Sequence, residues 1–324
     1  MLMTIRRRTR ILPAAESSGD SARSQIGRCL VLLLVAALPF VVTTEASASQ
    51  LIDRNATGVR LAANSKGEAL LTYRARGAWQ HVRVWGAVNA RQPRAGIPQV
   101  RLAKDYSGRY WQSFRNQCRP YDGPPLAFFV TACKAPDGSY WAVQSWQRTL
   151  PNFGAEAGLP VQRAWELHVS HWTSPLAKLE VWTDWVYAGR YHHLFGRLTY
   201  NGGPVYGFSS TRQGVPLDGY GRNIYLDTFN SRYGRGWHRE NGFLAHRPTG
   251  AFCYGFYPFT SRGPGNGSRY RLTVIGPGVT PDVSVTVAGL HDYNRASAAD
   301  VAYERQQNAL QASVAGADKQ CSVR

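Results

Sequence analysis

The sequence predicts an all-β protein, with an antiparallel β-sandwich or jelly-roll-like body followed by one C-terminal helix. Apolar and polar residues alternate over many short runs of the 324-residue chain, and Gly, Pro, Asn and Asp bound these runs. A helical pattern is present only near the C-terminus. We find no repeated period, which argues against a propeller or a solenoid.

Residues 1–48 are predicted to be a signal peptide that is removed on export. A basic region precedes the apolar run 29–42, and residues 46–48 (Ala-Ser-Ala) form a small-x-small cleavage site. The run rises about 21 Å as a helix, less than the ~30 Å hydrocarbon core of a bilayer. We therefore expect a secreted or cell-wall-associated protein that begins near Ser49 and has no membrane span. An uncleaved membrane anchor is the alternative.

Five strands are predicted between residues 49 and 150, each with the alternation of a half-buried strand. They cover residues 59–63, 68–74, 80–88, 126–133 and 140–148. The sequence Asn-Ser-Lys-Gly at 64–67 is typical of a tight hairpin turn, and so is Pro-Asp-Gly at 136–138. These turns predict that the first two strands and the last two strands form antiparallel pairs.

The alternation continues beyond a stretch with Gly and Pro at 151–160. The strands predicted there cover residues 165–172, 179–187, 191–200, 204–209, 251–257, 269–275 and 283–287. Residues 212–249 are rich in Gly and are predicted to form a long irregular loop. The stretch 151–160 fits a boundary between two lobes of the body, residues 49–290, and equally a loop inside one domain.

The tail, residues 291–324, is predicted to contain a helix over residues 298–315. Ser297 precedes this run as a candidate N-cap, with Asp300 in the first turn. The apolar residues of the run lie on one stripe, so we expect the helix to pack against the β body.

Four cysteines follow the leader, and we predict that they form two disulfides. An exported protein folds in an oxidising compartment, and four cysteines allow three pairings. Proximity in the sequence favours Cys118–Cys133, which leaves Cys253–Cys321 as the second bond. Neither a C-x-x-C nor an H-x-x-x-H spacing is present, so no metal site is predicted, and no cofactor motif is found.

The mature chain is strongly basic. Without the leader it has 32 Lys and Arg residues against 17 Asp and Glu residues, a net charge of +15. Such a surface favours anionic partners, for example acidic cell-wall polymers. No run of five or six basic residues is present, so nucleic acid is not an expected partner.

Two neighbouring predicted strands, 165–172 and 179–187, carry the first candidate ligand-binding face. If they form a hairpin with Ser170 opposite Glu180, then Glu166 lies opposite Asp184. Indole rings stack on the apolar faces of sugars, and carboxylates accept hydrogen bonds from hydroxyls. The alternative is an ordinary solvent-exposed face. The candidate contacts are Glu166, His168, Trp172, Glu180, Trp182 and Asp184.

The irregular segment 212–249 is predicted to lie over this face and to add ligand contacts. Its aromatic residues can anchor it to the sheets, which argues against disorder. Its candidate contacts are Arg222, Asp227 and His238. A packed structural loop, in which Arg and Asp side chains neutralise each other, is the alternative.

These observations favour a secreted or cell-wall-associated protein that binds carbohydrate or another surface polymer without catalysis. The first alternative is a polysaccharide hydrolase or lyase in which Glu166 and Asp184 are the catalytic pair. The second is a structural envelope protein that its positive charge holds to anionic polymers.

Overall fold

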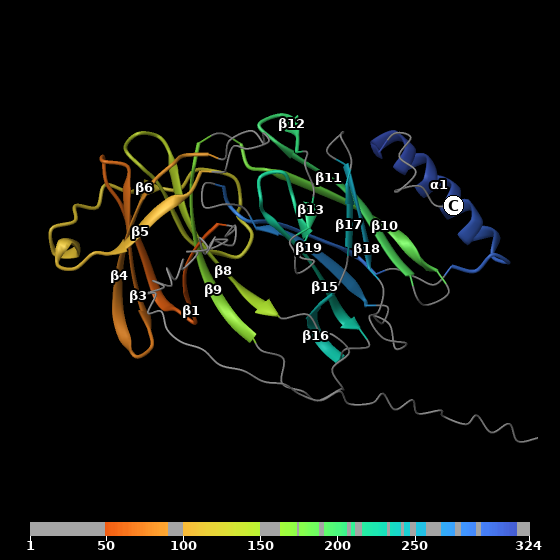
Figure 1. Ribbon diagram of the computed structural model, residues 1–324, viewed down its shortest axis with the longest axis horizontal. Helices are drawn as coiled ribbons and strands as arrows, with labels where there is room; N and C mark the ends of the chain where they lie inside the picture. Colours follow the sequence, from red (N-terminus) through yellow and green to blue (C-terminus); the bar gives the residue numbers. More distant parts are fainter. Residues whose placement is uncertain are drawn as a thin grey trace, which may run out of the picture. The chain divides into compact units, whose positions relative to one another are not determined.

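The computed structural model confirms an all-β fold with one α-helix at the C-terminal end of the described chain (Figure 1). The described residues all belong to one compact unit, Thr44–Arg324. They are residues 49–89, 100–149, 163–173, 175–187, 191–205, 209–210, 216–231, 234–240, 243–246, 251–256, 267–275, 280–289 and 293–315. The predicted signal peptide, the stretch 151–160 and Cys321 lie outside these residues.

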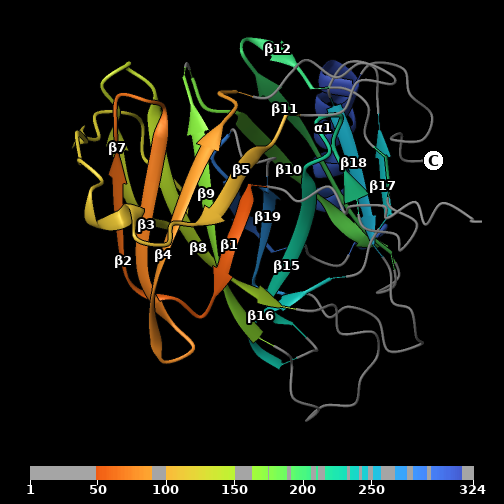
Figure 2. The same cartoon turned by 60° about the vertical axis from the view of Figure 1, so that its left-hand side comes forward.

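The N-terminal half forms two antiparallel sheets. The first sheet has the strand order β2 (Thr57–Ala63), β3 (Glu68–Ala75), β4 (Ala78–Gly86), β5 (Leu102–Tyr106). The second sheet has the order β1 (Gln50–Arg54), β9 (Arg163–Trp172), β8 (Tyr140–Thr149), β7 (Phe129–Lys134), β6 (Arg119–Pro120). In Figure 2, β3 and β4 lie in front of β8 and β9.

Side chains from the facing sides of these two sheets form one apolar core. Every second residue of a strand points into it, because successive side chains of a strand point to opposite faces. Leu71 and Val84 come from the first sheet, Trp141 and Val169 from the second, and all four are fully buried. Residues between the inner positions, such as His81 of β4, therefore lie on the outer face of the first sheet.

The C-terminal half forms two further antiparallel sheets around a second core. The third sheet has the order β13 (Ser209–Ser210), β14 (Pro216–Leu217), β15 (Asn223–Ser231), β19 (Arg269–Ile275), β20 (Val283–Ala288), and β16 (Gly234–Arg239) also pairs with β15. The fourth has the order β10 (Lys178–Tyr187), β11 (Tyr191–Tyr200), β18 (Ala251–Phe256), β17 (Phe243–His246), and β12 (Gly203–Pro204) also pairs with β11. Ile224, Leu226 and Leu272 of the third sheet pack with Leu194 and Leu198 of the fourth.

The helix α1 spans Ala298–Ala315, the bounds that the sequence predicts. The Ser297 hydroxyl accepts a hydrogen bond from the Asp300 amide (3.2 Å), so Ser297 caps the helix as expected. The helix contacts β11 and β18 of the fourth sheet. The predicted packing of the tail on the β body is thus confirmed.

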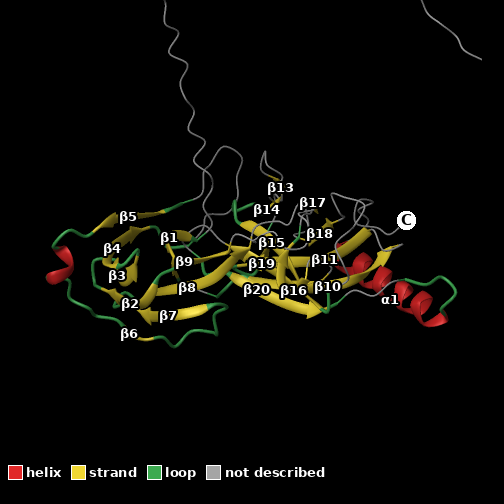
Figure 3. Cartoon of the chain, turned by 90° about the horizontal axis from the view of Figure 1, so that it is seen from below, coloured by secondary structure: helices red, strands yellow, loops and turns green. Residues whose placement is uncertain are grey.

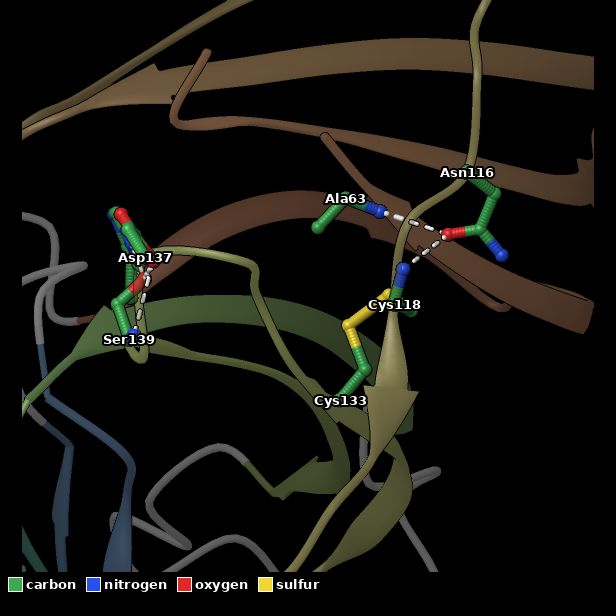
Figure 4. The surroundings of a disulfide bond; sticks show 7 residues. Ala63, Asn116, Cys118, Cys133, Asp137 and Ser139 are labelled. Carbon is green, nitrogen blue, oxygen red and sulfur yellow. Dashed lines mark hydrogen bonds between the residues drawn. A yellow bond between two sulfur atoms is a disulfide. The ribbon is translucent and has the colours of Figure 1, made fainter. Parts of the chain in front are cut away.

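Cys118 and Cys133 form the predicted disulfide (Figure 4). The Asn116 side-chain oxygen accepts hydrogen bonds from the backbone N–H groups of Cys118 (3.0 Å) and Ala63 (3.3 Å), and this holds the chain before Cys118 against β2. Cys253 lies in β18, and its predicted partner Cys321 is outside the described residues.

One prediction about an element is wrong, and several strands were not predicted. The segment 212–249 is not an irregular loop, because it contains β14, β15, β16 and β17, and β15 is a central strand of the third sheet. The strands β1, β5 and β6 were not predicted either. The two turns at 64–67 and 136–138 are confirmed: they join β2 to β3 and β7 to β8, and Gly67 (φ 71°) and Gly138 (φ 85°) adopt the left-handed conformation there.

Candidate functional site

The predicted hairpin between the strands that contain Glu166 and Asp184 is wrong. The strand β9 pairs with β8 and β1 in the second sheet, whereas β10 pairs with β11 in the fourth. Glu166 lies opposite Trp146 of β8 and Arg54 of β1. Asp184 lies in β10, where the register shifts between Thr183 and Val186, and its side chain is outside the described part of the structure. The hydrolase alternative therefore lacks the strand pairing on which it was based.

The face of β9 that was predicted to be open is buried. Glu166, His168 and Trp172 are 6 %, 4 % and 1 % exposed. The opposite face of β9 packs into the first core, so this strand is covered on both sides. Trp172 packs against the ring of Tyr140 (centroids 5.4 Å apart). Their role as ligand contacts stays a prediction, but not on an exposed sheet face.

Glu180 and Trp182 lie on β10, in another sheet from Glu166. The Glu180 carboxylate accepts hydrogen bonds from Arg197 (2.7 Å) and forms an ion pair with Lys178 (2.9 Å). Hydrogen bonds from Lys178 and Arg197 lower the pKa of Glu180. Trp182 stacks on its cross-strand neighbour Phe195, with ring centroids 5.4 Å apart.

The candidates from the segment 212–249 are buried in the third sheet and its connections. Arg222 is fully buried, donates to Asp218 (2.5 Å) and lies over the ring of Tyr220 (4.9 Å). His238 is 5 % exposed, and one of its ring nitrogens lies 3.0 Å from the Arg235 carbonyl oxygen. For Arg222, the alternative of a neutralised structural pair describes the observed contact.

Asp227 holds two arginines of neighbouring strands. Its carboxylate accepts hydrogen bonds from Arg239 (2.7 Å) and Arg271 (3.0 Å), and Asp227 and Arg239 are almost fully buried. The Arg239 guanidinium lies over the ring of Tyr225 (3.8 Å) and near that of Trp146 (5.8 Å). A single carboxylate thus fixes both guanidinium groups where the second and third sheets meet.

Trp146 lies between the candidate residues of β9 and those of the segment 212–249. Its ring lies 5.7 Å from that of His168 on β9 and 5.6 Å from that of Tyr225 on β15. Burial lowers the pKa of His168, but Glu166, 3.4 Å away, together with the charge of Asp282, raises it above the ordinary value. The ring contacts of Trp146 thus join β8 and β9 of the second sheet to β15 of the third.

The outer face of the first sheet carries a second set of residues, which the sequence analysis did not select. Inner residues of β4 such as Val82 are buried, so the residues that alternate with them point away from the core. Trp79 is 52 % exposed, and its ring reaches across β3 to the neighbourhood of Gly58 on β2. We define the aromatic face by its outward residues on β3 and β4 and by the two aromatic residues above them. They are Arg74, Trp79, His81, Arg83, Trp85, Tyr110 and Trp111.

The segment 107–117 crosses this outer face from β5 to the edge of β2. Its short 3-10 helix, Tyr110–Gln112, lies beyond β3 and β4 on the side away from β8 (Figure 3). Trp111 stacks flat on His81 (centroids 4.1 Å apart, planes 4° apart) and is 40 % exposed. One face of the indole is used for this contact.

Ionic and cation–π contacts fix the centre of the aromatic face. Glu68 accepts hydrogen bonds from Tyr110 (2.7 Å), Asn64 (2.9 Å) and Arg83. Burial opposes the ionisation of Glu68, but these hydrogen bonds outweigh it and lower its pKa. The Arg83 guanidinium also lies over the ring of Trp85 (4.6 Å). These contacts therefore hold the side chains around Arg83 in place.

A signal for the aromatic face was present in the sequence. In β4, Val82 and Val84 alternate with His81, Arg83 and Trp85, which predicts one apolar and one mixed face. The position of Trp111 had no such signal, because it depends on the path of the segment 107–117 across the sheet.

Among the described residues, no group of three or more His, Cys, Asp and Glu side chains is arranged to hold a metal ion. In the same part of the chain, no helix combines the length and apolar character needed to cross a bilayer. Comparison of the chain with known protein families, with curated proteins and with solved structures finds no match. The features that describe this protein are therefore its all-β fold and the aromatic face.

Proposed function

We propose that the mature protein is a secreted or cell-wall-associated β protein that binds an extracellular polysaccharide through the aromatic face. The observation that supports this most directly is the exposure of Trp79 and Trp111 on one side of one sheet. Exposed indoles of this kind provide flat apolar surface for sugar rings, and neighbouring polar groups can bond to hydroxyls.

The spacing of the side chains along β4 also fits an extended ligand. Outward residues of a strand repeat every two positions, or roughly 6.6 Å, so Trp79 and Trp85 are about 20 Å apart along the strand. His81, with Trp111 stacked on it, lies between them. A linear polymer stacked on Trp79 would next reach the exposed indole of Trp111, because the crossing segment 107–117 covers β4 from His81 to Arg83.

The test compares the two exposed tryptophans of the aromatic face with Trp165, an exposed tryptophan of another sheet. Mature protein, residues 49–324, is applied to an immobilised polysaccharide, and retention is measured for Trp79→Ala, Trp111→Ala and the double variant. We expect each substitution to weaken binding roughly tenfold, because each removes aromatic surface worth ~1.5 kcal/mol or more. Circular dichroism verifies that the variants remain folded.

The control is Trp165→Ala. Trp165 has the same 52 % exposure as Trp79, but it lies on β9 of the second sheet. Retention that falls equally in Trp165→Ala, or that survives in the double variant, contradicts the proposal. Survival in the double variant would instead favour an envelope protein held to polymers by charge alone.

A further inference from the structure

We propose that the polysaccharide bound by the aromatic face is acidic, with a carboxylate on the sugar that stacks on Trp79, as in a uronic acid. This inference rests on the proposed function and names its class of ligand. It follows from the distribution of charge around Trp79 rather than from the net charge of the chain.

The first sheet and its connections are strongly basic. Within the described residues 57–89 and 100–117 there are nine Lys and Arg residues but only two acidic residues, Glu68 and Asp105. Glu68 is buried and its charge is balanced by Arg83. Asp105 lies on the edge strand β5, opposite Arg83. Neither carboxylate lies opposite Trp79 in a strand pair: Glu68 is opposite Trp85 and Asp105 is opposite Arg83.

Two arginines near Trp79, Arg60 and Arg74, are exposed. Arg74 lies directly opposite Trp79 in the β3–β4 pair, and its guanidinium carbon is 5.8 Å from the indole centroid. Arg60 of β2 lies opposite Thr72, the next outward residue of β3 after Arg74. In the part of the chain that the structure describes, Arg60 and Arg74 form no ion pair with Asp or Glu.

This geometry favours a negative charge on the stacked sugar. A guanidinium group binds a carboxylate with two parallel hydrogen bonds, which a neutral hydroxyl cannot accept in the same way. Because the Arg74 guanidinium lies over the ring of Trp79, 5.8 Å from its centroid, we expect a substituent that projects past the edge of a stacked sugar to reach it. A carboxylate on the ring is such a substituent.

The experiment uses two polymers with the same backbone and different charge. Immobilised polygalacturonate and its fully methyl-esterified form are compared as ligands for the mature protein. We expect the acidic form to bind roughly tenfold more tightly, and Arg74→Gln and Arg60→Gln each to lose about fivefold for that form only. Arg101→Gln, which removes an exposed charge before β5, is the matched control and should change little.

The outcomes separate this inference from the proposed function. Equal binding of both polymers, with loss in Trp79→Ala, would overturn the inference and leave polysaccharide binding standing. Binding of neither polymer would count against both. A preference for the acidic form that persists in the Arg60→Gln/Arg74→Gln double variant would assign it to net charge, and would overturn the inference. The inference would also be overturned if the protein bound a poly(glycerol phosphate) as tightly as polygalacturonate and Trp79→Ala left that binding unchanged.

Discussion

At the scale of single residues, two histidines of β9 show how burial and partners act on one strand. His171 is stacked on Trp141 (centroids 3.8 Å apart), and its Nε2 is 2.8 Å from the Ser139 hydroxyl. Burial lowers the pKa of His171 to about 4. His168 is buried to a similar degree, but nearby carboxylates raise its pKa. The two side chains therefore contribute to the pH dependence of stability with opposite signs.

The lowered pKa of His171 predicts a loss of stability in mild acid. Between the ordinary pKa of about 6.5 and the folded value of about 4, the unfolded chain binds a proton that the folded chain does not. The free energy of unfolding should thus fall as the pH drops through this range. Urea unfolding at pH 4.5 and pH 7 should show a smaller difference for His171→Gln than for the unsubstituted protein.

His168→Gln is the contrasting variant. The raised pKa of His168 gives stability that is present at low pH and is lost as the pH rises through the folded value. Its removal should therefore make the fall of stability toward pH 4.5 steeper. The same change of slope in both variants would show that the opposite pKa shifts are not what governs this pH dependence.

Residue patterns identified which side chains share a face, but not whether that face is open. In β9, Glu166 and His168 do lie on one face, opposite Leu167 and Val169. That face is covered because the chain near Asp282 and Ser49 packs on it: the His168 ring bonds to the Ser49 hydroxyl (2.7 Å). The cover comes from segments more than 100 residues away, and no local pattern contains that information.

At the scale of elements, the sequence located most strands but not their pairing. The strands 191–200 and 269–275 have the predicted bounds. The strand β15 was not predicted because glycines surround it in the sequence, although its buried residues Ile224, Leu226 and Thr228 occur at every second position. The short connection after β9 favoured a hairpin with β10, since consecutive strands usually pair. Here the chain passes from one sheet to another at that point, and pairing depends on long-range packing.

The Cys118–Cys133 disulfide gives a prediction at this scale. It closes a loop with a sequence separation of 15 residues, and constraint of the unfolded chain is worth about 3 kcal/mol for such a loop. The Cys118→Ala/Cys133→Ala variant should therefore have a free energy of unfolding lower by about that amount in urea. Because the segment with Trp111 ends at Cys118, polysaccharide retention should also weaken. Unchanged stability and retention would contradict both expectations.

At the scale of the whole molecule, buried polar contacts add to the ring contacts of Trp146 in joining the two cores. Gln144 of β8 is fully buried, donates to the carbonyl oxygens of Ala127 (2.6 Å) and Asp282 (2.9 Å), and accepts from the Asp282 amide (2.9 Å). Ser170 of β9 donates to the Thr280 carbonyl oxygen (2.9 Å). These bonds tie the second sheet to the chain that enters β20.

The connection through Gln144 predicts that the two cores unfold together. In Gln144→Leu the backbone N–H and C=O of Asp282 lose their partner while remaining buried, at about 1–3 kcal/mol for each group left unsatisfied. We expect one urea transition for the unsubstituted protein and a lower midpoint for the variant, seen equally by tryptophan fluorescence and far-ultraviolet circular dichroism. Gln112→Leu, at an exposed position in the first sheet's crossing segment, should leave the midpoint nearly unchanged. Two separate transitions in the unsubstituted protein would show that the cores are energetically independent, and that the aromatic face could fold without the C-terminal half.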